Sequence, residues 1–211
     1  MHEEAMEHLA RRDRVMARLI RQAGPCTLKA EPRRTPYQSL VRAVAHQQLN
    51  GTAAATILRR FQALFPGRRF PRPEDVAAAA DEALRSAGLS GSKVAAIRDI
   101  TAKVLSGEIP GSRAMRGMSD EEVVERLTAA RGVGRWTVEM LLMFQLGRPD
   151  VLPADDYGVR TGFRIAYRRE DLPRPRELQA FGERWRPHRT VAAWYLWRAV
   201  DLAKQAPKSV A

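Results

Sequence analysis

The sequence contains a single cysteine, Cys26, among its 211 residues. One thiol excludes an intramolecular disulfide, an iron–sulfur cluster held by cysteines and a zinc site built from several cysteines. The sequence also lacks any run of about 18 apolar residues, so we expect no membrane-spanning helix. Its first residues mix glutamates with arginines and do not form the pattern of a signal peptide. Together these absences favour a cytoplasmic protein.

Acidic residues are scarce relative to basic ones. The chain has 36 lysines and arginines against 24 aspartates and glutamates, which gives a formal net charge of +12. Such an excess is typical of a protein with a polyanionic partner, either nucleic acid or an anionic membrane. A basic surface with no such partner is the simpler alternative, and composition alone leaves it open.

Strand-like alternation of apolar and polar residues is absent as well. Apolar residues recur at helical spacing, and turn residues separate the segments. We therefore expect an all-α protein, and 211 residues suit either one large domain or two small lobes. The predicted helices cover residues 4–22, 37–49, 52–65, 74–80, 81–87, 92–105, 156–168 and 189–204, with two more in a hairpin over about 119–146 and a short one after Pro173 and Pro175.

The hairpin turns on Gly132, Val133 and Gly134, in the segment "RGVGRWTVEM". Ser119 and Glu122 have the spacing of a capping box at its entrance. A glycine turn before a helix leaves backbone N–H groups unpaired where the helix dipole also favours an anion such as phosphate. Simple helix termination is the alternative, but the basic chain favours DNA. We expect DNA contacts from Gly132, Val133, Gly134, Arg135 and Thr137.

Two adjacent aspartates follow the hairpin in "LPADDYGVR". Either Asp155 or Asp156 suits the N-cap of the next helix, which leaves the other carboxylate to be explained.

Five segments in order resemble the alkylpurine DNA glycosylases of the helix-hairpin-helix superfamily, of the DNA-3-methyladenine glycosylase II type. The segments are "VAHQQLNGTAA", "GLSGSKVAAIRDI", "LTAARGVGRWTVEM", "LPADDYGVR" and "WRPHRTVAAWYLWR". The resemblance extends over about residues 31 to 200. It implies two helical lobes with a cleft between them, within a single domain over residues 1–211. It implies a bacterial, nucleoid-associated enzyme of base excision repair that acts on double-stranded DNA as a monomer and requires no cofactor.

The resemblance implies that Asp156 is the catalytic carboxylate, because it matches the second aspartate of the family's pair. A fixed carboxylate stabilises the oxocarbenium charge that develops when an N-glycosidic bond breaks. Asp155 is then expected to be the N-cap or a loop residue.

Trp136 occupies the position at which bifunctional relatives have a lysine that forms a Schiff base. An indole cannot do so, and we expect a monofunctional enzyme that leaves the abasic site uncut. The indole can stack on a cationic alkylated base, and Trp197 matches a second wall of the same pocket. Core packing is the alternative for both, and is our expectation for Trp185 and Trp194.

Gln48 matches the residue that fills the gap left by a flipped base, where some relatives have leucine. Gln47 is either its neighbour or a helix-capping amide. His46 lies near the pocket in one alternative, but we expect it to be structural. By the resemblance, Met140 occupies the position of a pocket tyrosine, and we expect the chain to be too short for the β-rich N-terminal domain of an enzyme of this type. An open pocket should accept 3-methyladenine and 7-methylguanine, and additionally 1-methyladenine or 3-methylcytosine.

The hairpin also resembles those that hold a monovalent cation on backbone carbonyls, which by position would be those of Thr128, Ala130 and Val133. Two other functions stay open: a glycosylase for oxidised or mismatched bases, and a non-catalytic DNA-binding module. The former usually requires the lysine or a cysteine cluster, and the latter has no use for a carboxylate near phosphate.

Overall fold

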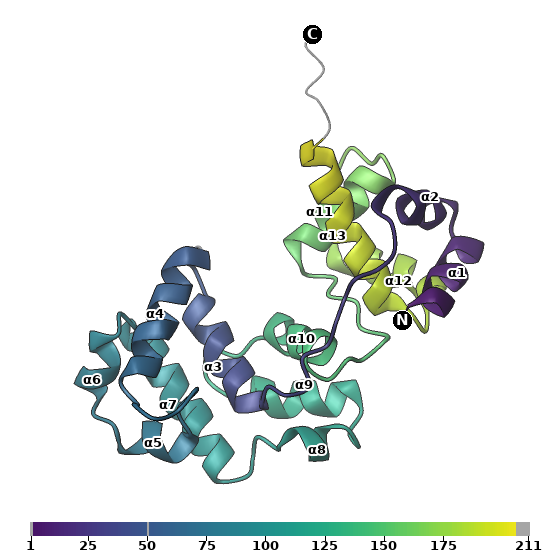
Figure 1. Cartoon of the computed structure of the whole chain (residues 1–211). Helices are drawn as coiled ribbons and strands as arrows, with labels where there is room; N and C mark the ends of the chain where they lie inside the picture. Colours follow the sequence, from purple (N-terminus) through teal and green to yellow (C-terminus); the bar gives the residue numbers. More distant parts are fainter. Residues whose placement is uncertain (1, 50, 206–211) are drawn as a thin grey trace. The chain divides into compact units, whose positions relative to one another are not determined.

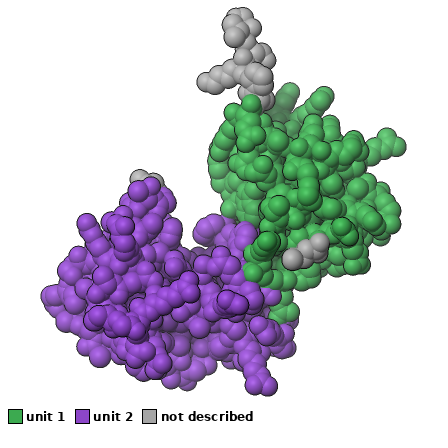
Figure 2. Space-filling model, in the orientation of Figure 1, with its two compact units in different colours: residues 1–30, 147–211 green, residues 31–146 purple. Residues whose placement is uncertain are grey.

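The computed structural model describes residues 2–49 and 51–205, and all regular structure within them is helical (Figure 1). The chain divides into two compact units: unit 1 consists of residues 1–30 and 147–211, and unit 2 of residues 31–146 (Figure 2). These results confirm the all-α prediction. Unit 1 contains α1 (Glu3–Arg12), α2 (Arg14–Ala23), α11 (Tyr157–Ala166), α12 (Pro175–Gly182), the 3₁₀ helix η1 (Glu183–Trp185) and α13 (Arg189–Gln205). Unit 2 contains α3 (Pro36–His46), α4 (Gly51–Ala63), α5 (Pro73–Ala78), α6 (Asp81–Ser86), α7 (Gly91–Leu105), α8 (Ser112–Met115), α9 (Asp120–Thr128) and α10 (Arg135–Phe144).

The prediction of one helix over residues 4–22 was wrong, because Asp13 divides it into α1 and α2. The backbone of Asp13 is extended, and its carboxylate caps α2 by accepting the N–H groups of Val15 and Met16 at 2.9 and 3.3 Å. Asp13 is 7% exposed, and its second oxygen accepts the Tyr167 hydroxyl and the Trp185 indole N–H. A helix continuing through this position would lose these bonds.

The buried Trp185 confirms the prediction of core packing for that residue. Trp194, for which we also predicted core packing, is only half-buried, and Arg198 lies over its ring. Helix α8 was not predicted, because a four-residue helix is too short to show a period.

Helices α11 and α13 pack against each other through a glycine. A Cβ atom on Gly162 would lie 1.9 Å from the carbonyl oxygen of Leu196, so only glycine permits the approach of the two backbones. Four residues earlier on the same face, a Cβ on Gly158 would lie 2.9 Å from the Trp197 ring. Two glycines one turn apart thus set the distance between α11 and α13.

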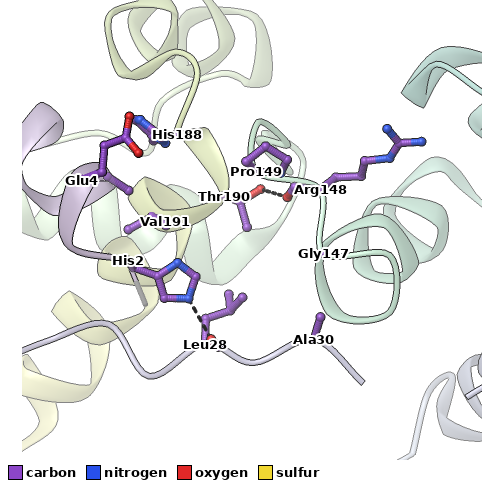
Figure 3. Close-up of a pocket in the computed structure, with 11 residues that line it drawn as sticks. His2, Glu4, Leu28, Ala30, Gly147, Arg148, Pro149, His188, Thr190 and Val191 are labelled. Atoms are coloured by element: carbon purple, nitrogen blue, oxygen red, sulfur yellow. Dashed lines mark hydrogen bonds between the residues drawn. The ribbon is translucent and has the colours of Figure 1, made fainter. Parts of the chain in front are cut away.

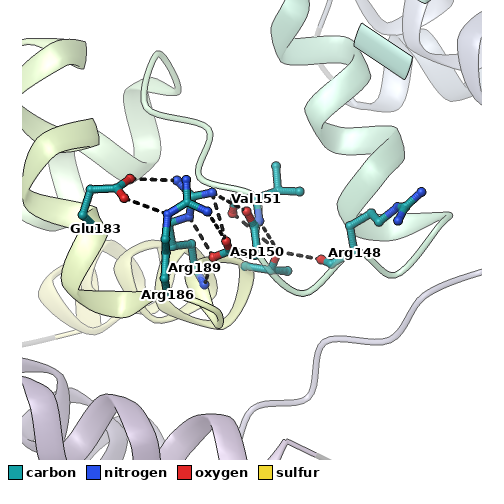
Figure 4. A network of polar contacts seen from close by, with 7 residues as sticks. Arg148, Asp150, Val151, Glu183, Arg186 and Arg189 are labelled. Carbon is teal, nitrogen blue, oxygen red and sulfur yellow. Dashed lines mark hydrogen bonds and ion pairs between the residues drawn. The ribbon is translucent and has the colours of Figure 1, made fainter. Parts of the chain in front are cut away.

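The segment between α10 and α11 is held by a charged network at the start of α13 (Figure 4). The carboxylate of Asp150 accepts from the buried guanidinium of Arg189 at 2.8 Å and from Arg186 at 2.6 Å. Glu183 pairs with both arginines. The Thr190 hydroxyl donates to the carbonyl of residue 148 and accepts the N–H of residue 151. This network fixes the start of the segment that leads to residue 156.

In unit 2, α7 contacts both α3 and α5. Arg98 donates to carbonyls at the end of α5, including Val76 at 2.6 Å, and pairs with Asp81. Lys93 donates to the Ala45 carbonyl at 2.8 Å, near the end of α3. These bonds satisfy carbonyls that the helix ends leave unpaired.

We expect Gly162→Ala to lower the free energy of unfolding by about 3 kcal/mol or more, because the new methyl group overlaps a backbone carbonyl that cannot rotate away. Urea unfolding followed by circular dichroism measures this. Gly111→Ala is the control, since no atom lies within 4 Å of a Cβ added there. An equal midpoint for Gly162→Ala and the native protein would contradict the packing described.

Candidate functional site

The predicted hairpin is formed by α9 and α10. Ser119 and Glu122 make the predicted capping box, with both reciprocal hydrogen bonds present. Gly132 has φ +76°, and its close approach to Ala96 of α7 leaves 3.1 Å for an added Cβ. A second support from α7 is the carboxylate of Asp99, which accepts the N–H of Arg131 at 2.7 Å.

Three backbone donors of the turn are exposed. Within the described residues no acceptor pairs with the N–H of Gly132, Gly134 or Arg135. At the N-terminus of α10 these groups can bind an anion, as predicted from the glycines. The prediction needs correction for two residues. Val133 is 5% exposed and donates its N–H to Ala130 at 3.1 Å, while Thr137 is 6% exposed and donates its N–H to Gly134 at 3.0 Å, so neither backbone N–H is available to a phosphate.

Arg135, the predicted phosphate ligand, forms an ion pair within the hairpin. Both of its terminal nitrogens donate to Glu121 of α9, the shortest distance being 2.7 Å. Both side chains are exposed, so the pair is worth less than about 1 kcal/mol. Arg135 can therefore exchange Glu121 for a phosphate at little cost.

A pocket of about 450 Å³ lies between the C-terminal end of α3 and the N-terminal end of α10. Its walls are Ala43, His46, Gln47, Gln48, Trp136, Thr137 and Met140. Trp136 is 47% exposed, which excludes core packing as the reason for this tryptophan. The structure thus brings together Trp136 and Met140 of the predicted base pocket, and adds Gln48, which was predicted to enter the gap left by a flipped base.

The three residues at the end of α3 differ in their contacts. Gln47 donates its amide N–H to the Gly132 carbonyl at 2.7 Å and so ties the pocket to the hairpin. Gln48 is exposed, with φ +57°, a left-handed backbone that turns the chain sharply after α3. His46 was expected to be structural, but it is exposed and lines the pocket. Burial and the nearby charges of Arg42 and Lys93 lower the pKa of His46.

Asp156 and Trp197 lie in unit 1, where they contact each other. Asp156 is the N-cap of α11, and its Oδ1 accepts the N–H of Val159 at 2.7 Å and the indole N–H of Trp197 at 2.8 Å. Of the two roles expected for Asp155, the N-cap falls to Asp156, and Asp155 is an exposed residue of the turn before α11. One carboxylate, that of Asp156, thus both caps the helix and binds the indole. The half-buried Trp197 is not a core residue.

Gly158 is a site residue that the sequence analysis missed. A Cβ on Gly158 would lie 3.0 Å from the Trp197 Nε1 and 3.1 Å from the Asp156 Oδ1, so a side chain there would displace this pair. The sequence shows a glycine directly after Asp156 and Tyr157, but the need for a glycine there comes from Trp197 on α13.

A second cavity, of about 350 Å³, lies in unit 1 (Figure 3). His2, Leu28, Gly147, His188 and Thr190 are among its walls, and no predicted site residue is. Within the described residues, no cluster of three or more histidine, cysteine, aspartate or glutamate side chains could bind a metal ion.

Comparison with known proteins identifies the family. Residues 41–187 match the HhH-GPD superfamily of base excision DNA repair proteins. The chain belongs to the HhH-GPD superfamily. It is 40% identical to the DNA-3-methyladenine glycosylase 1 of Schizosaccharomyces pombe over 93% of this chain and 86% of that protein. Identity to the DNA-3-methyladenine glycosylase 2 of Escherichia coli is 26%, over 76% of this chain and 56% of that protein.

Solved structures agree with the sequence relatives. The S. pombe 3-methyladenine DNA glycosylase in complex with abasic DNA superposes with a TM-score of 0.83 at 39% identity, over 95% of this chain and 98% of that one. The Bacillus halodurans DNA-3-methyladenine glycosidase gives 0.84 at 37% identity, over 94% and 89%. From the family match and these relatives, we conclude that the chain is a DNA glycosylase of base excision repair.

No helix among the described residues is long and apolar enough to cross a membrane. The relatives come from fission yeast as well as from bacteria, so they give no support to the predicted nucleoid location.

We expect Glu121→Gln to tighten binding to undamaged duplex about two- to fivefold, because it removes the competitor of phosphate for Arg135. Fluorescence anisotropy with a labelled duplex at low salt measures the affinity. Glu125→Gln, on the same exposed helix, changes the net charge equally without freeing Arg135. Equal gains from the two variants would show that Arg135 does not contact DNA.

We expect Trp197→Phe to slow base release about ten- to a hundredfold, since Asp156 loses the donor that orients it. Single-turnover kinetics at saturating enzyme separate this step from binding, which should change little. Trp194→Phe removes an indole from the same helix that does not bind Asp156, and should retain the native rate. Equal rates for Trp197→Phe and the native enzyme would refute the orienting role.

Proposed function

We propose that this protein is a monofunctional DNA glycosylase that hydrolyses the N-glycosidic bond of alkylated bases. The observation that carries the proposal is the exposed indole of Trp136 in the pocket, at the position that bifunctional relatives give to a lysine. No lysine lines the pocket, so no Schiff base can form there with the sugar. Cleavage then uses water and leaves the abasic site uncut.

Asp156 supplies the charge that the reaction needs. As the bond from the sugar C1′ to the base nitrogen breaks, positive charge develops on the sugar and the base leaves with the electron pair. A carboxylate held by Val159 and Trp197 cannot turn away from this charge. Water then bonds to C1′ and gives up a proton, for which Asp156 is the acceptor or the orienting group.

The pocket suits a base that is positively charged. Trp136 presents an aromatic face on which a cationic purine can stack, and the thioether of Met140 adapts to its shape. An alkylated base is already a good leaving group, so the reaction needs no general acid. The proposed substrates are 3-methyladenine and 7-methylguanine, with 1-methyladenine and 3-methylcytosine as additional cations. The chain is more similar to the S. pombe glycosylase 1 (40% identity) than to the E. coli glycosylase 2 (26% identity). This difference supports a glycosylase for alkylated bases in general, and does not favour the type II assignment.

Binding to the duplex uses the other unit-2 residues. The exposed N–H groups of Gly132, Gly134 and Arg135 bind phosphate, and Gln48 enters the gap left by the flipped base. The S. pombe relative, whose structure contains abasic DNA, supports this function. The enzyme acts as a monomer.

A monovalent cation at the hairpin is part of the proposal. Of the carbonyls of Thr128, Ala130 and Val133, only that of Ala130 accepts a hydrogen bond among the described residues. This arrangement fits carbonyl ligation. A bound cation would add positive charge beside the phosphate site.

The test uses oligonucleotides that each contain one lesion, with chromatography of the released bases. We expect release of 3-methyladenine and 7-methylguanine, and little release of 8-oxoguanine, which is neutral and has a stable glycosidic bond. Strand cleavage should appear only after hot alkali. Release of 8-oxoguanine with methylated bases left intact would overturn the alkylbase proposal.

Asp156→Asn should abolish release while DNA affinity stays equal or improves. Asparagine is also a good N-cap and retains an oxygen for Val159 and Trp197, so the fold is preserved. Asp155→Asn is the matched control and should retain activity. Near-native release by Asp156→Asn would refute the role of this carboxylate.

A further inference from the structure

His46 is a titratable group in the pocket whose ring has no hydrogen-bond partner among residues 2–49 and 51–205. It is the last residue of α3 and lines the same cavity as Trp136. No described residue makes a hydrogen bond to its ring, whereas the neighbouring amide of Gln47 is committed to Gly132. The imidazole is therefore available to whatever occupies the pocket.

The groups around His46 keep its ring uncharged at neutral pH. Partial burial lowers its pKa from 6.5, and the positive charges of Arg42, one turn earlier on α3, and Lys93 of α7 lower it further. Helix α10 contributes Trp136, Thr137 and Met140 to the same pocket, and none of these ionises near neutrality. No acidic side chain contributes to the shift.

An uncharged imidazole has one nitrogen that accepts a hydrogen bond. An imidazolium has two donors and no acceptor, and it repels a cation. The protonation state of His46 therefore determines whether this wall attracts or rejects a positively charged base with an amino group.

We propose that His46 is a specificity-determining residue of the pocket: its imidazole accepts a hydrogen bond from the amino group of a positively charged base that lies on Trp136. This role rests on the glycosylase function proposed above. His46 holds the base and takes no part in the bond cleavage at the sugar.

The sign of the pH dependence follows from the lowered pKa. Above the ordinary histidine pKa of about 6.5, His46 is neutral and binding is complete. Below the folded-state pKa, each unit of pH reduces the neutral fraction about tenfold, and release of a cationic base should fall in proportion. A glutamine at this position offers an amide oxygen that does not titrate.

The experiment measures kcat/KM for 3-methyladenine release from about pH 8 to about pH 5, with spontaneous loss subtracted. We expect native enzyme and His46→Gln to be similar at the upper end. Their ratio should fall about tenfold per pH unit below the pKa of His46. His46→Leu, which has no acceptor, should release 3-methyladenine about tenfold more slowly than His46→Gln at every pH, with an unchanged thermal midpoint.

His2→Gln is the control, because it makes the same exchange in the other cavity and should give a ratio to native enzyme that is independent of pH. A pH-independent ratio for His46→Gln, in an enzyme that releases methylated bases, would overturn the proposal for His46 alone. No release by the native enzyme at any pH would refute the glycosylase proposal itself. The two failures are thus distinguishable.

Discussion

The close approach of α11 and α13 is the constraint on which the chemistry of unit 1 depends. Gly162 lets the backbone of α11 reach the Leu196 carbonyl, and Gly158, one turn earlier, leaves room for the indole of Trp197. Asp156 caps the same helix, so its carboxylate meets that indole without further adjustment. The packing of the two backbones at Gly158 and Gly162 therefore determines the orientation of the Asp156 carboxylate.

Unit 2 achieves a comparable result with hydrogen bonds at helix ends. Asp99 and Gln47 hold the hairpin from α7 and from the end of α3, through the backbone of residues 131 and 132. Because Gln47 also lines the pocket, the proposed base-binding wall and the proposed phosphate-binding turn share one support. In the proposed complex, a phosphate contact at the hairpin is thus linked to the position of the pocket residues.

The positive charge of the chain is partly used inside the protein. Arg189 and Arg186 neutralise Asp150 and fix the segment before α11, and Arg98 caps α5. Glu121 holds Arg135 in an exposed pair that is easily broken. The net charge of +12 therefore overstates the number of side chains available to DNA. Backbone N–H groups of the hairpin supplement them at a defined position.

The sequence by itself determined the helical class, the hairpin and its capping box, because these follow from local spacing and from residues a few positions apart. Through the order of five segments, it also placed Trp136 and Met140 in one pocket, and these two residues line the same cavity. It could not determine which aspartate caps α11, nor that Asp13 divides the first helix, because both depend on indole partners more than 40 residues away along the chain. The exposure of His46 and the burial of Val133 and Thr137 were decided only by packing. A helical residue's spacing predicts its face, but only the neighbouring helices decide whether that face is covered.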